Sequence, residues 1–246
     1  MQTKQTLITA VIAAIIGAGS AHFLPQQPAV GTSDETIKNY ILSNPQLIMD
    51  SVQKWQEQQR QAKTAGATEA LKDAEVQKSL YDNPRSPFIG PKDAKAVVVE
   101  FFDYNCPACK MAFKSIDELV TKDKNVKVIF KEFPIFGPVS DTNSKIGLAV
   151  HTLAPEKYFK FHTKMMSIEG RADEAMALKF ASEVGLKQAD VKAEIAKPEY
   201  QEYLDSMRAL GSKLGVQGTP SFVIGEEFVP HALDYNGLEA KVAPLR

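Results

Sequence analysis

The chain contains 246 residues, of which 44% are hydrophobic and 24% are charged. This composition is that of a folded protein of one or two domains, and it excludes collagen, low-complexity disorder and a disulfide-dense miniprotein. With 29 basic and 30 acidic residues, the formal charge of −1 leaves no excess charge to attract nucleic acid or acidic lipid. Two cysteines are present, three positions apart.

The first residues have the layout of a secretory signal. Lys4 precedes an uncharged run over residues 7–19, and small residues up to Ala21 follow. We expect residues 1–21 to be a signal peptide that is cleaved after Ala21. A retained membrane anchor is the alternative, but the run is rich in Ala, Gly and Thr, whereas a spanning helix needs about 20 strongly apolar residues. Both alternatives export the remaining chain, for which we predict the oxidising periplasm of a Gram-negative bacterium.

Residues 22–85 are predicted to form an N-terminal helical region and linker. Thr32 and Glu35 fit a capping box, and Asn44-Pro45 is a predicted helix break. The helical segment carries an apolar stripe made of Ile37, Ile41, Ile48, Val52 and Trp55. Because an exposed stripe of this kind needs a partner, we expect residues 34–56 to associate with copies of themselves, as a dimer or a trimer. A solvated connector is the alternative.

A second segment of this region, residues 53–83, is rich in Gln, Lys, Ala and Glu and sparse in apolar residues. Such a stretch has helical propensity but too narrow an apolar stripe to form a core. We therefore predict a solvated helical arm that joins the self-associating segment to the following domain.

Residues 86–246 are predicted to form a compact α/β domain. The pattern predicts strand, helix, strand, a helical block, two short strands and a final helix, at residues 96–102, 106–121, 126–132, about 138–215, 221–224, 227–229 and 234–242. The first strand–helix–strand unit implies parallel pairing through a right-handed crossover.

The two cysteines stand in a Cys106-Pro107-Ala108-Cys109 motif that follows the first strand and opens a helix. A helix N-terminus presents unpaired N–H groups and partial positive charge, which lowers the pKa of a thiol there below its free value of about 8.5. Pro107 suits the first helical turn. Cys109 lies one turn further on and can close a disulfide with Cys106. We therefore predict a redox-active pair.

A CxxC motif can also be half of a zinc site or an inert structural disulfide. Structural zinc needs four ligands, yet no second cysteine pair exists and the four histidines are scattered. A disulfide loop this short does little to constrain an unfolded chain. Redox chemistry is therefore favoured, and no metal or cofactor is expected; two thiolates alone make a weak copper site.

Other residues of the domain also allow two interpretations. Glu100 lies inside the apolar strand, where a carboxylate is costly to bury. It is either an outward-facing strand end or, as we favour, a buried acid with a raised pKa that exchanges a proton with Cys109. Lys131-Glu132 is predicted to be a solvated pair, and the alternative is that it tunes the electrostatic field of the active site. The helical stripe at 158–165, with Tyr158, Phe161, His162 and Met165, is predicted to belong to the core, and the alternative is that it lines a groove.

The strand, the Cys-Pro-Ala-Cys helix, the helical insertion and Gly218-Thr219-Pro220 before a late strand together resemble the DsbA family of thioredoxin-like proteins. The resemblance covers about residues 86–246 and implies a thioredoxin fold with a helical insertion. It implies that Pro220 is cis, whereas trans is the default for an X-Pro bond. It also implies a substrate-peptide groove lined by Pro107, Ala108, Thr219 and Pro220, and the buried-acid role for Glu100.

The segment from Tyr40 to Met49 is similar to the leader of the ScsC-like branch, whose members oligomerise through N-terminal segments. The chain departs from the strongly oxidising DsbA pattern in having Ala108 in place of His, and Thr219, as in DsbC-like isomerases, in place of Val. The resemblance thus implies a periplasmic thiol–disulfide oxidoreductase that isomerises or introduces disulfides in exported clients and uses a DsbB-like or DsbD-like membrane partner. A pure DsbA-like oxidase and a periplasmic holdase with secondary redox activity are the alternatives.

Overall fold

The computed structural model describes residues 34–246. The signal-peptide prediction for residues 1–21 and the predicted N-cap Thr32 lie outside the described residues. The chain divides into two compact units, Met1–Val52 and Gln53–Arg246. Within the described residues, no helix has the length and apolar character needed to cross a membrane.

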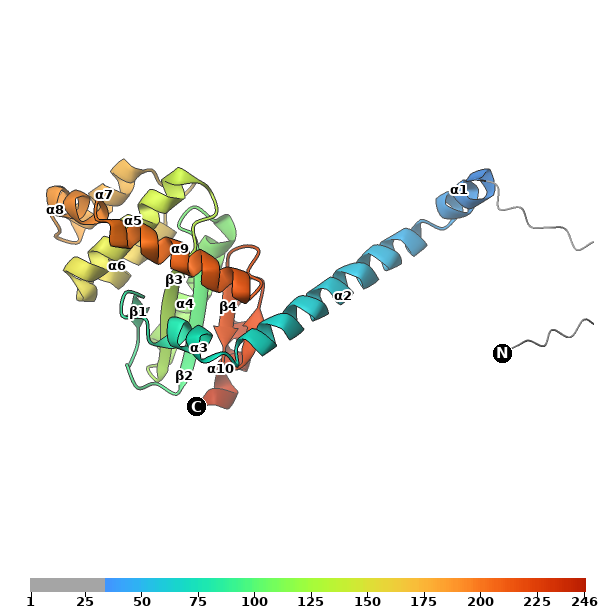
Figure 1. The fold of residues 1–246 in the computed structure, drawn as a ribbon, viewed down its shortest axis with the longest axis horizontal. Helices are drawn as coiled ribbons and strands as arrows, with labels where there is room; N and C mark the ends of the chain where they lie inside the picture. Colours follow the sequence, from blue (N-terminus) through green and yellow to red (C-terminus); the bar gives the residue numbers. More distant parts are fainter. Residues whose placement is uncertain (1–33) are drawn as a thin grey trace, which may run out of the picture. The chain divides into compact units, whose positions relative to one another are not determined.

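The first unit contains α1 (Asp34–Ser43) and the start of α2 (Pro45–Ala70), both visible in Figure 1. The predicted break is confirmed, since Asn44 alone separates the two helices. Pro45 disfavours helical backbone at the preceding residue but suits the first position of α2. The Asn44 side chain donates to the Tyr40 carbonyl at 2.8 Å, which satisfies one of the last carbonyls of α1.

Large apolar side chains are exposed along α1 and the first turns of α2, and α1 buries none of its residues. They are Ile37, Tyr40, Ile41, Leu42, Leu47, Ile48, Met49, Val52 and Trp55. Exposure of this many large apolar groups on neighbouring turns is typical of a surface that binds a partner.

The second unit is built on a mixed sheet with the strand order β1-β3-β2-β4-β5. Its strands are β1 (Phe88–Ile89), β2 (Ala96–Phe102), β3 (Val126–Glu132), β4 (Ser221–Ile224) and β5 (Glu227–Val229). The parallel pairing of β2 with β3 and the antiparallel β4–β5 hairpin confirm the sequence prediction. Strand β1, antiparallel to β3, was not predicted because two residues are too short to show a periodic pattern.

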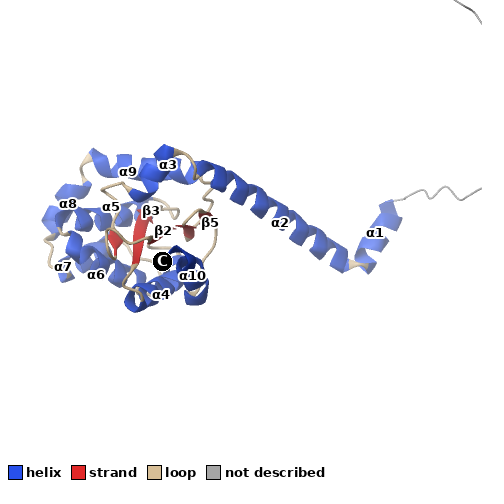
Figure 2. Ribbon diagram, turned by 90° about the horizontal axis from the view of Figure 1, so that it is seen from below, coloured by secondary structure: helices blue, strands red, loops and turns tan. Residues whose placement is uncertain are grey.

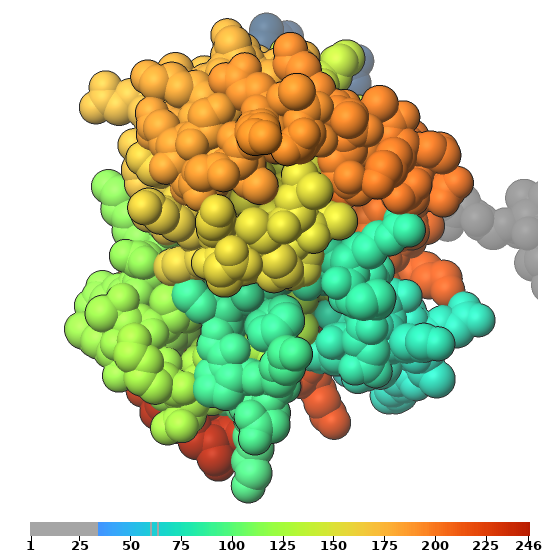
Figure 3. All heavy atoms as spheres, turned by 90° about the vertical axis from the view of Figure 1, so that its left-hand side faces the viewer, coloured from blue at the N-terminus to red at the C-terminus, as the bar shows by residue number. Residues whose placement is uncertain are grey.

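Helices cover both faces of this sheet, as Figure 2 shows around the red strands. They are α3 (Ala74–Tyr81), α4 (Pro107–Lys122), α5 (Pro138–Leu153), α6 (Pro155–Met166), α7 (Glu174–Glu183), α8 (Gln188–Ile195), α9 (Pro198–Lys213) and α10 (Tyr235–Val242). Helices α5 to α9 form the insertion expected at about residues 138–215. In Figure 3 the residues of α6 to α9, yellow to orange, gather on one side of the unit.

Successive residues of β2 face opposite helical layers, which explains why its whole sequence is apolar apart from Glu100. Phe101 makes an edge contact with Phe133, whose ring in turn packs on Gly211 of α9. Phe102 faces the other way and contacts the His162 ring of α6 at 4.9 Å. The predicted core stripe of α6 is confirmed, since Tyr158, Phe161, His162 and Met165 are all buried.

The C-terminal part of the predicted solvated arm differs from the sequence prediction. Ala67, Leu71, Val76 and Leu80 are buried and belong to the hydrophobic core of the second unit. Asp73 begins α3 as its N-cap, because its carboxylate accepts hydrogen bonds from two N–H groups in the first turn of that helix. Residues near 67–80 are therefore part of the domain's core.

The prediction of a solvated Lys131–Glu132 pair is wrong, because both side chains are fully buried. Alternation along β3 sends them to opposite faces of the sheet. The Lys131 ammonium donates to the Ser79 carbonyl of α3 and to the Ser86 hydroxyl, each at 2.7 Å, and burial lowers the pKa of Lys131 to about 7. Burial raises the pKa of Glu132 well above its usual range. An isolated charged pair in a sequence does not reveal that helices cover both sides of its strand.

Candidate active site

The two cysteines lie where β2 passes into α4. Cys106 is the N-cap of α4 and Pro107 occupies its first turn, as the sequence predicted. Both cysteines are reduced thiols, with Cys106 4% exposed and Cys109 fully buried. The Cys106 thiol donates to the carbonyl oxygen of Thr219 at 3.2 Å. The pair therefore lies between the start of α4 and the segment before β4.

The surroundings of Cys106 stabilise its thiolate. The Cys109 thiol donates a hydrogen bond to the Cys106 sulfur, and this contact is the largest cause that lowers the pKa of Cys106, to about 6. Burial opposes the change, whereas the Thr219 side chain and the N–H groups of Ala108 and Cys109 add to it. Unpaired amides at a helix N-terminus have this effect on any anion placed there.

Cys109 has the opposite character. Burial raises its pKa far above the ordinary value for a thiol, and its hydrogen bond to Cys106 and the charge of Glu100 raise it further. Near neutral pH the pair therefore consists of one thiolate, at Cys106, and one protonated thiol. This asymmetry distinguishes the sulfur that can attack from the sulfur that must first lose a proton.

Glu100 is buried in the middle of the sheet, which excludes the outward-facing interpretation. It pairs with Phe130 of β3 and Phe222 of β4, and its side chain is fully buried. Among the described residues, neither carboxylate oxygen has a hydrogen-bond partner. Burial raises the pKa of Glu100 well above its usual range, and the negative charge of Cys106 adds to the increase.

The segment before β4 completes the surroundings of the cysteines. The Thr219–Pro220 peptide bond is cis, as the DsbA resemblance implied. Pro220 is buried, while Pro107 is exposed and Ala108 is half-buried beside it in sequence. The tertiary structure thus brings Thr219, more than a hundred positions away in the chain, into contact with Cys106.

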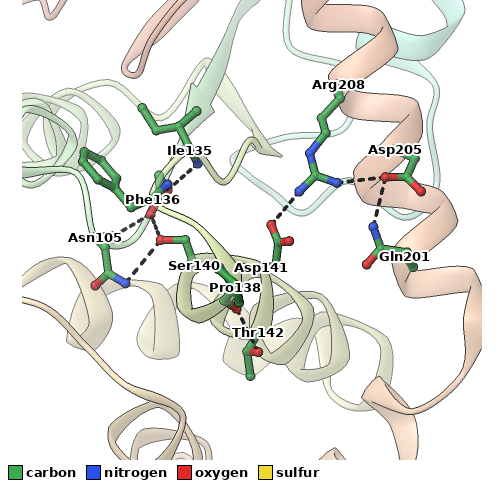
Figure 4. Close-up of polar contacts among 11 residues, drawn as sticks. Asn105, Ile135, Phe136, Pro138, Ser140, Asp141, Thr142, Gln201, Asp205 and Arg208 are labelled. Carbon is green, nitrogen blue, oxygen red and sulfur yellow. Dashed lines mark hydrogen bonds and ion pairs between the residues drawn. The ribbon is translucent and has the colours of Figure 1, made fainter.

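The sequence analysis missed a buried polar cluster directly before the motif, part of which is drawn in Figure 4. The Asp103 carboxylate accepts hydrogen bonds from the N–H groups of Asn105 and Ile135 at 2.7 Å, from Phe136 at 3.2 Å, and from the Ser140 hydroxyl at 2.8 Å. The cluster joins the β2–α4 loop to the start of α5. The signal for this cluster in the sequence was the presence of two polar residues, Asp103 and Asn105, between an apolar strand and the CxxC motif.

The described residues contain no group of three or more His, Cys, Asp or Glu side chains placed to hold a metal ion. The site therefore presents two thiols, one buried carboxyl group and a peptide segment containing a cis proline.

Comparisons with known proteins identify the family to which this chain belongs. A family profile described as Thioredoxin matches residues 82–243, and one described as Copper resistance protein ScsC N-terminal domain matches residues 34–62. The chain is 30% identical over 151 residues to a protein named probable disulfide bond formation protein D from Bacillus anthracis, covering 55% of this chain and 68% of that protein.

Two solved structures are similar over most of their length. The catalytic domain of Proteus mirabilis ScsC is 32% identical, with a TM-score of 0.65, and the match covers 72% of this chain and 97% of that one. A thioredoxin-like oxidoreductase from Silicibacter pomeroyi is 36% identical, also with a TM-score of 0.65, and the match covers 68% and 96%. The chain therefore belongs to the thioredoxin family, among its DsbA/ScsC-like thiol–disulfide oxidoreductases.

Proposed function

We propose that the protein isomerises wrongly paired disulfides, and also introduces disulfides, in exported proteins of the periplasm. Cys106 is the nucleophile, Cys109 the resolving thiol and Glu100 the group that exchanges a proton with Cys109. The observation that carries this proposal is the opposite character of the two facing sulfurs, one with a pKa lowered to about 6 and one with a pKa raised by burial.

The exchange runs through a mixed disulfide. The Cys106 thiolate attacks one sulfur of a client disulfide, so that the client S–S bond breaks, a Cys106–client S–S bond forms and a client thiolate leaves. In isomerisation, a client thiolate attacks the mixed disulfide, forms a new client disulfide and regenerates the Cys106 thiolate without net oxidation. Alternatively, Cys109 passes its proton to the ionised carboxylate form of Glu100 and attacks the Cys106 sulfur. The client then leaves as a reduced thiolate, and the Cys106–Cys109 disulfide forms.

The same site can oxidise a client when its disulfide is already formed. A client thiolate attacks the Cys106 sulfur, Cys109 leaves and takes up a proton, and a second client thiolate completes the client disulfide. A redox partner must then restore the starting state, and the resemblance points to a DsbB-like or DsbD-like membrane protein. Pro107, Ala108, Thr219 and Pro220 line the groove that receives the client peptide in this proposal.

Three features favour isomerisation over oxidation alone. Position 108 is Ala, so the motif lacks an imidazole that would stabilise the thiolate further. Position 219 is Thr, the residue of DsbC-like isomerases. The exposed apolar stripe at residues 34–56, which overlaps the match to the ScsC N-terminal domain, supports self-association and hence several catalytic sites on one assembly.

The test is reactivation of scrambled ribonuclease by the mature, full-length protein and by I41D/I48D, which places two charges on the stripe. We expect the variant to sediment as a monomer. Its reactivation rate should fall about tenfold, because joining several sites in one assembly raises the effective concentration of a second site near a client that is already bound. Its oxidation of reduced ribonuclease should be retained. Both isoleucines are exposed and belong to the first unit, so the second unit, which carries the cysteines, should remain folded.

The matched control is N39D/Q53D, which adds the same charge at exposed positions outside the stripe. The control should remain oligomeric and fully active. The proposed role of the stripe in self-association is contradicted if the unmodified protein sediments as a monomer. Its proposed role in isomerisation is contradicted if both variants reactivate ribonuclease equally. Absence of reactivation together with fast oxidation of reduced ribonuclease contradicts isomerisation and supports a DsbA-like oxidase.

A further inference from the structure

Helix α9 approaches the segment after β3 closely at one glycine. The helix lies against β3 (Figure 1), and Gly211 in its last turn faces the ring of Phe133. A methyl group at position 211 would lie 2.8 Å from Cζ of that ring and closer still to Cε2. Carbon atoms pack at about 3.5–4.0 Å, so a larger residue at 211 requires that the ring or the helix moves.

The Phe133 ring is held by the sheet. Its backbone N–H donates to the Phe102 carbonyl at 2.8 Å, which extends the ladder between β2 and β3. The ring makes an edge contact with Phe101 at a centroid distance of 5.8 Å, and Phe133 is only 9% exposed. Because protein interiors are close-packed, the room for a methyl group at Gly211 must come from a shift of the end of α9.

Gly211 also fixes the start of the segment that leads to the cysteines. Its carbonyl accepts from the Val216 N–H at 2.8 Å, and the Gly215 N–H donates to the Ser212 carbonyl at 3.2 Å. Gly215 has a φ of 69°, so the end of α9 has the hydrogen bonds and the left-handed residue of a Schellman motif. The position of Val216 therefore follows from that of Gly211.

The other end of this segment is tied to the strand that precedes the CxxC motif. Ser221, the first residue of β4, lies opposite Phe101 in the pairing with β2. Thr219 lies two residues before it, and its carbonyl accepts from the Cys106 thiol at 3.2 Å. The same Phe101 contacts the Phe133 ring, which thus separates α9 from β2. A shift of the end of α9 reaches Thr219 within a few residues.

We propose that Gly211 is a positioning residue for the active site. By admitting the Phe133 ring against the backbone of α9, it sets the place of residues 216–220 and so of the Thr219 carbonyl beside the Cys106 sulfur. The proposal rests on the peptide groove of the proposed function, to which this segment contributes. It assigns to a glycine of the helical insertion, far from the cysteines in the chain, the alignment of a client peptide with Cys106.

The test compares two disulfides in their reaction with the reduced full chain. One is a short peptide whose cysteine carries a nitrobenzoate thiol, and the other is dithiobis(nitrobenzoate), which has no peptide to align. In both reactions the Cys106 thiolate attacks a sulfur, a new S–S bond to Cys106 forms and nitrobenzoate thiolate leaves, whose absorbance gives the rate. G211A should lose about tenfold in rate with the peptide and less than about twofold with the small disulfide, because only the peptide must be oriented by the groove.

A second substitution makes the test specific for the contact. F133L removes the ring that the added methyl group meets, and alone it should slow the peptide reaction about threefold, because residues 216–220 lose a support. Independent effects would multiply in G211A/F133L to about thirtyfold, whereas relief of the clash should bring the double variant to within about threefold of the unmodified rate. If G211A does not fold, F133L alone decides, since its loss must also be confined to the peptide.

The matched control is G66A, which makes the same substitution inside α2. Among the described residues, nothing outside the neighbouring helix backbone lies within 4 Å of a methyl group at that position. G66A should react with both disulfides at the unmodified rates. Equal losses with the two disulfides in G211A, or a double variant no faster than G211A, would overturn the proposal. An unmodified protein that reacts with neither disulfide contradicts exchange at Cys106 itself, so the two failures are distinguishable.

Discussion

Replacement of Cys106 by Ala is expected to abolish thiol–disulfide exchange, by at least about a thousandfold in the rate with a client disulfide. Exchange requires a thiolate, and the one remaining cysteine is buried with a raised pKa. The C109A variant should behave differently, because Cys106 can still attack. It should accumulate client proteins joined to Cys106, visible as larger species on a non-reducing gel and released by a reducing agent.

The matched control for both variants is S115A, a substitution on the same helix that leaves the two sulfurs in place. It should exchange at the unmodified rate. Accumulation of adducts in C106A rather than in C109A would reverse the assigned roles. The C106A variant also tests the holdase alternative, since a holdase should still suppress aggregation of a client that has no cysteine.

Replacement of Glu100 by Gln is expected to slow the resolution step by about a hundredfold, the usual effect of removing a proton-transfer group. Attack by Cys106 should stay within about twofold, because the amides and the Cys109 thiol that stabilise its thiolate remain. Rapid quenching of a reaction with a small disulfide measures both steps. The Cys106 adduct should form at the normal rate in E100Q and then persist.

The matched control is E132Q, which removes a second fully buried acid from the neighbouring strand. Burial raises the pKa of both carboxyl groups, and of the two it is Glu100 whose charge affects Cys109. E132Q should therefore resolve mixed disulfides normally. If both variants slow resolution equally, the effect comes from the packing of the sheet and the proton of Cys109 takes another route.

The stability of E100Q gives a second readout with a defined sign. The folded protein keeps the Glu100 proton to a higher pH than the unfolded chain, whose carboxyl group titrates near its ordinary value of 4.5. Above that pH the folded state binds more protons, so this group contributes stability that is lost as the pH rises. In E100Q this slope is absent, and its free energy of unfolding should decrease less between about pH 5 and pH 8 than that of the unmodified protein.

The sequence predicted the elements of the second unit well where local patterns are strong. The strands at 96–102 and 126–132 were predicted with the bounds that the structure has. The start of a helix at the CxxC motif and the break at Asn44 followed from the placement of Pro107 and Pro45. These features depend on apolar runs and on proline, whose effects act over a few residues.

The sequence by itself thus determined the position of the CxxC motif, the strand–helix unit that carries it and the apolar stripe of α1 and α2. The tertiary structure decided the burial of Lys131 and Glu132, the inclusion of Ala67 and Leu80 in the core, and the close approach of Gly211 to Phe133. The physical reason is that burial and the surroundings of a charge depend on which distant segments cover it. Periodicity reports which residues share a face of one element, whereas the partner of that face is chosen by the whole fold.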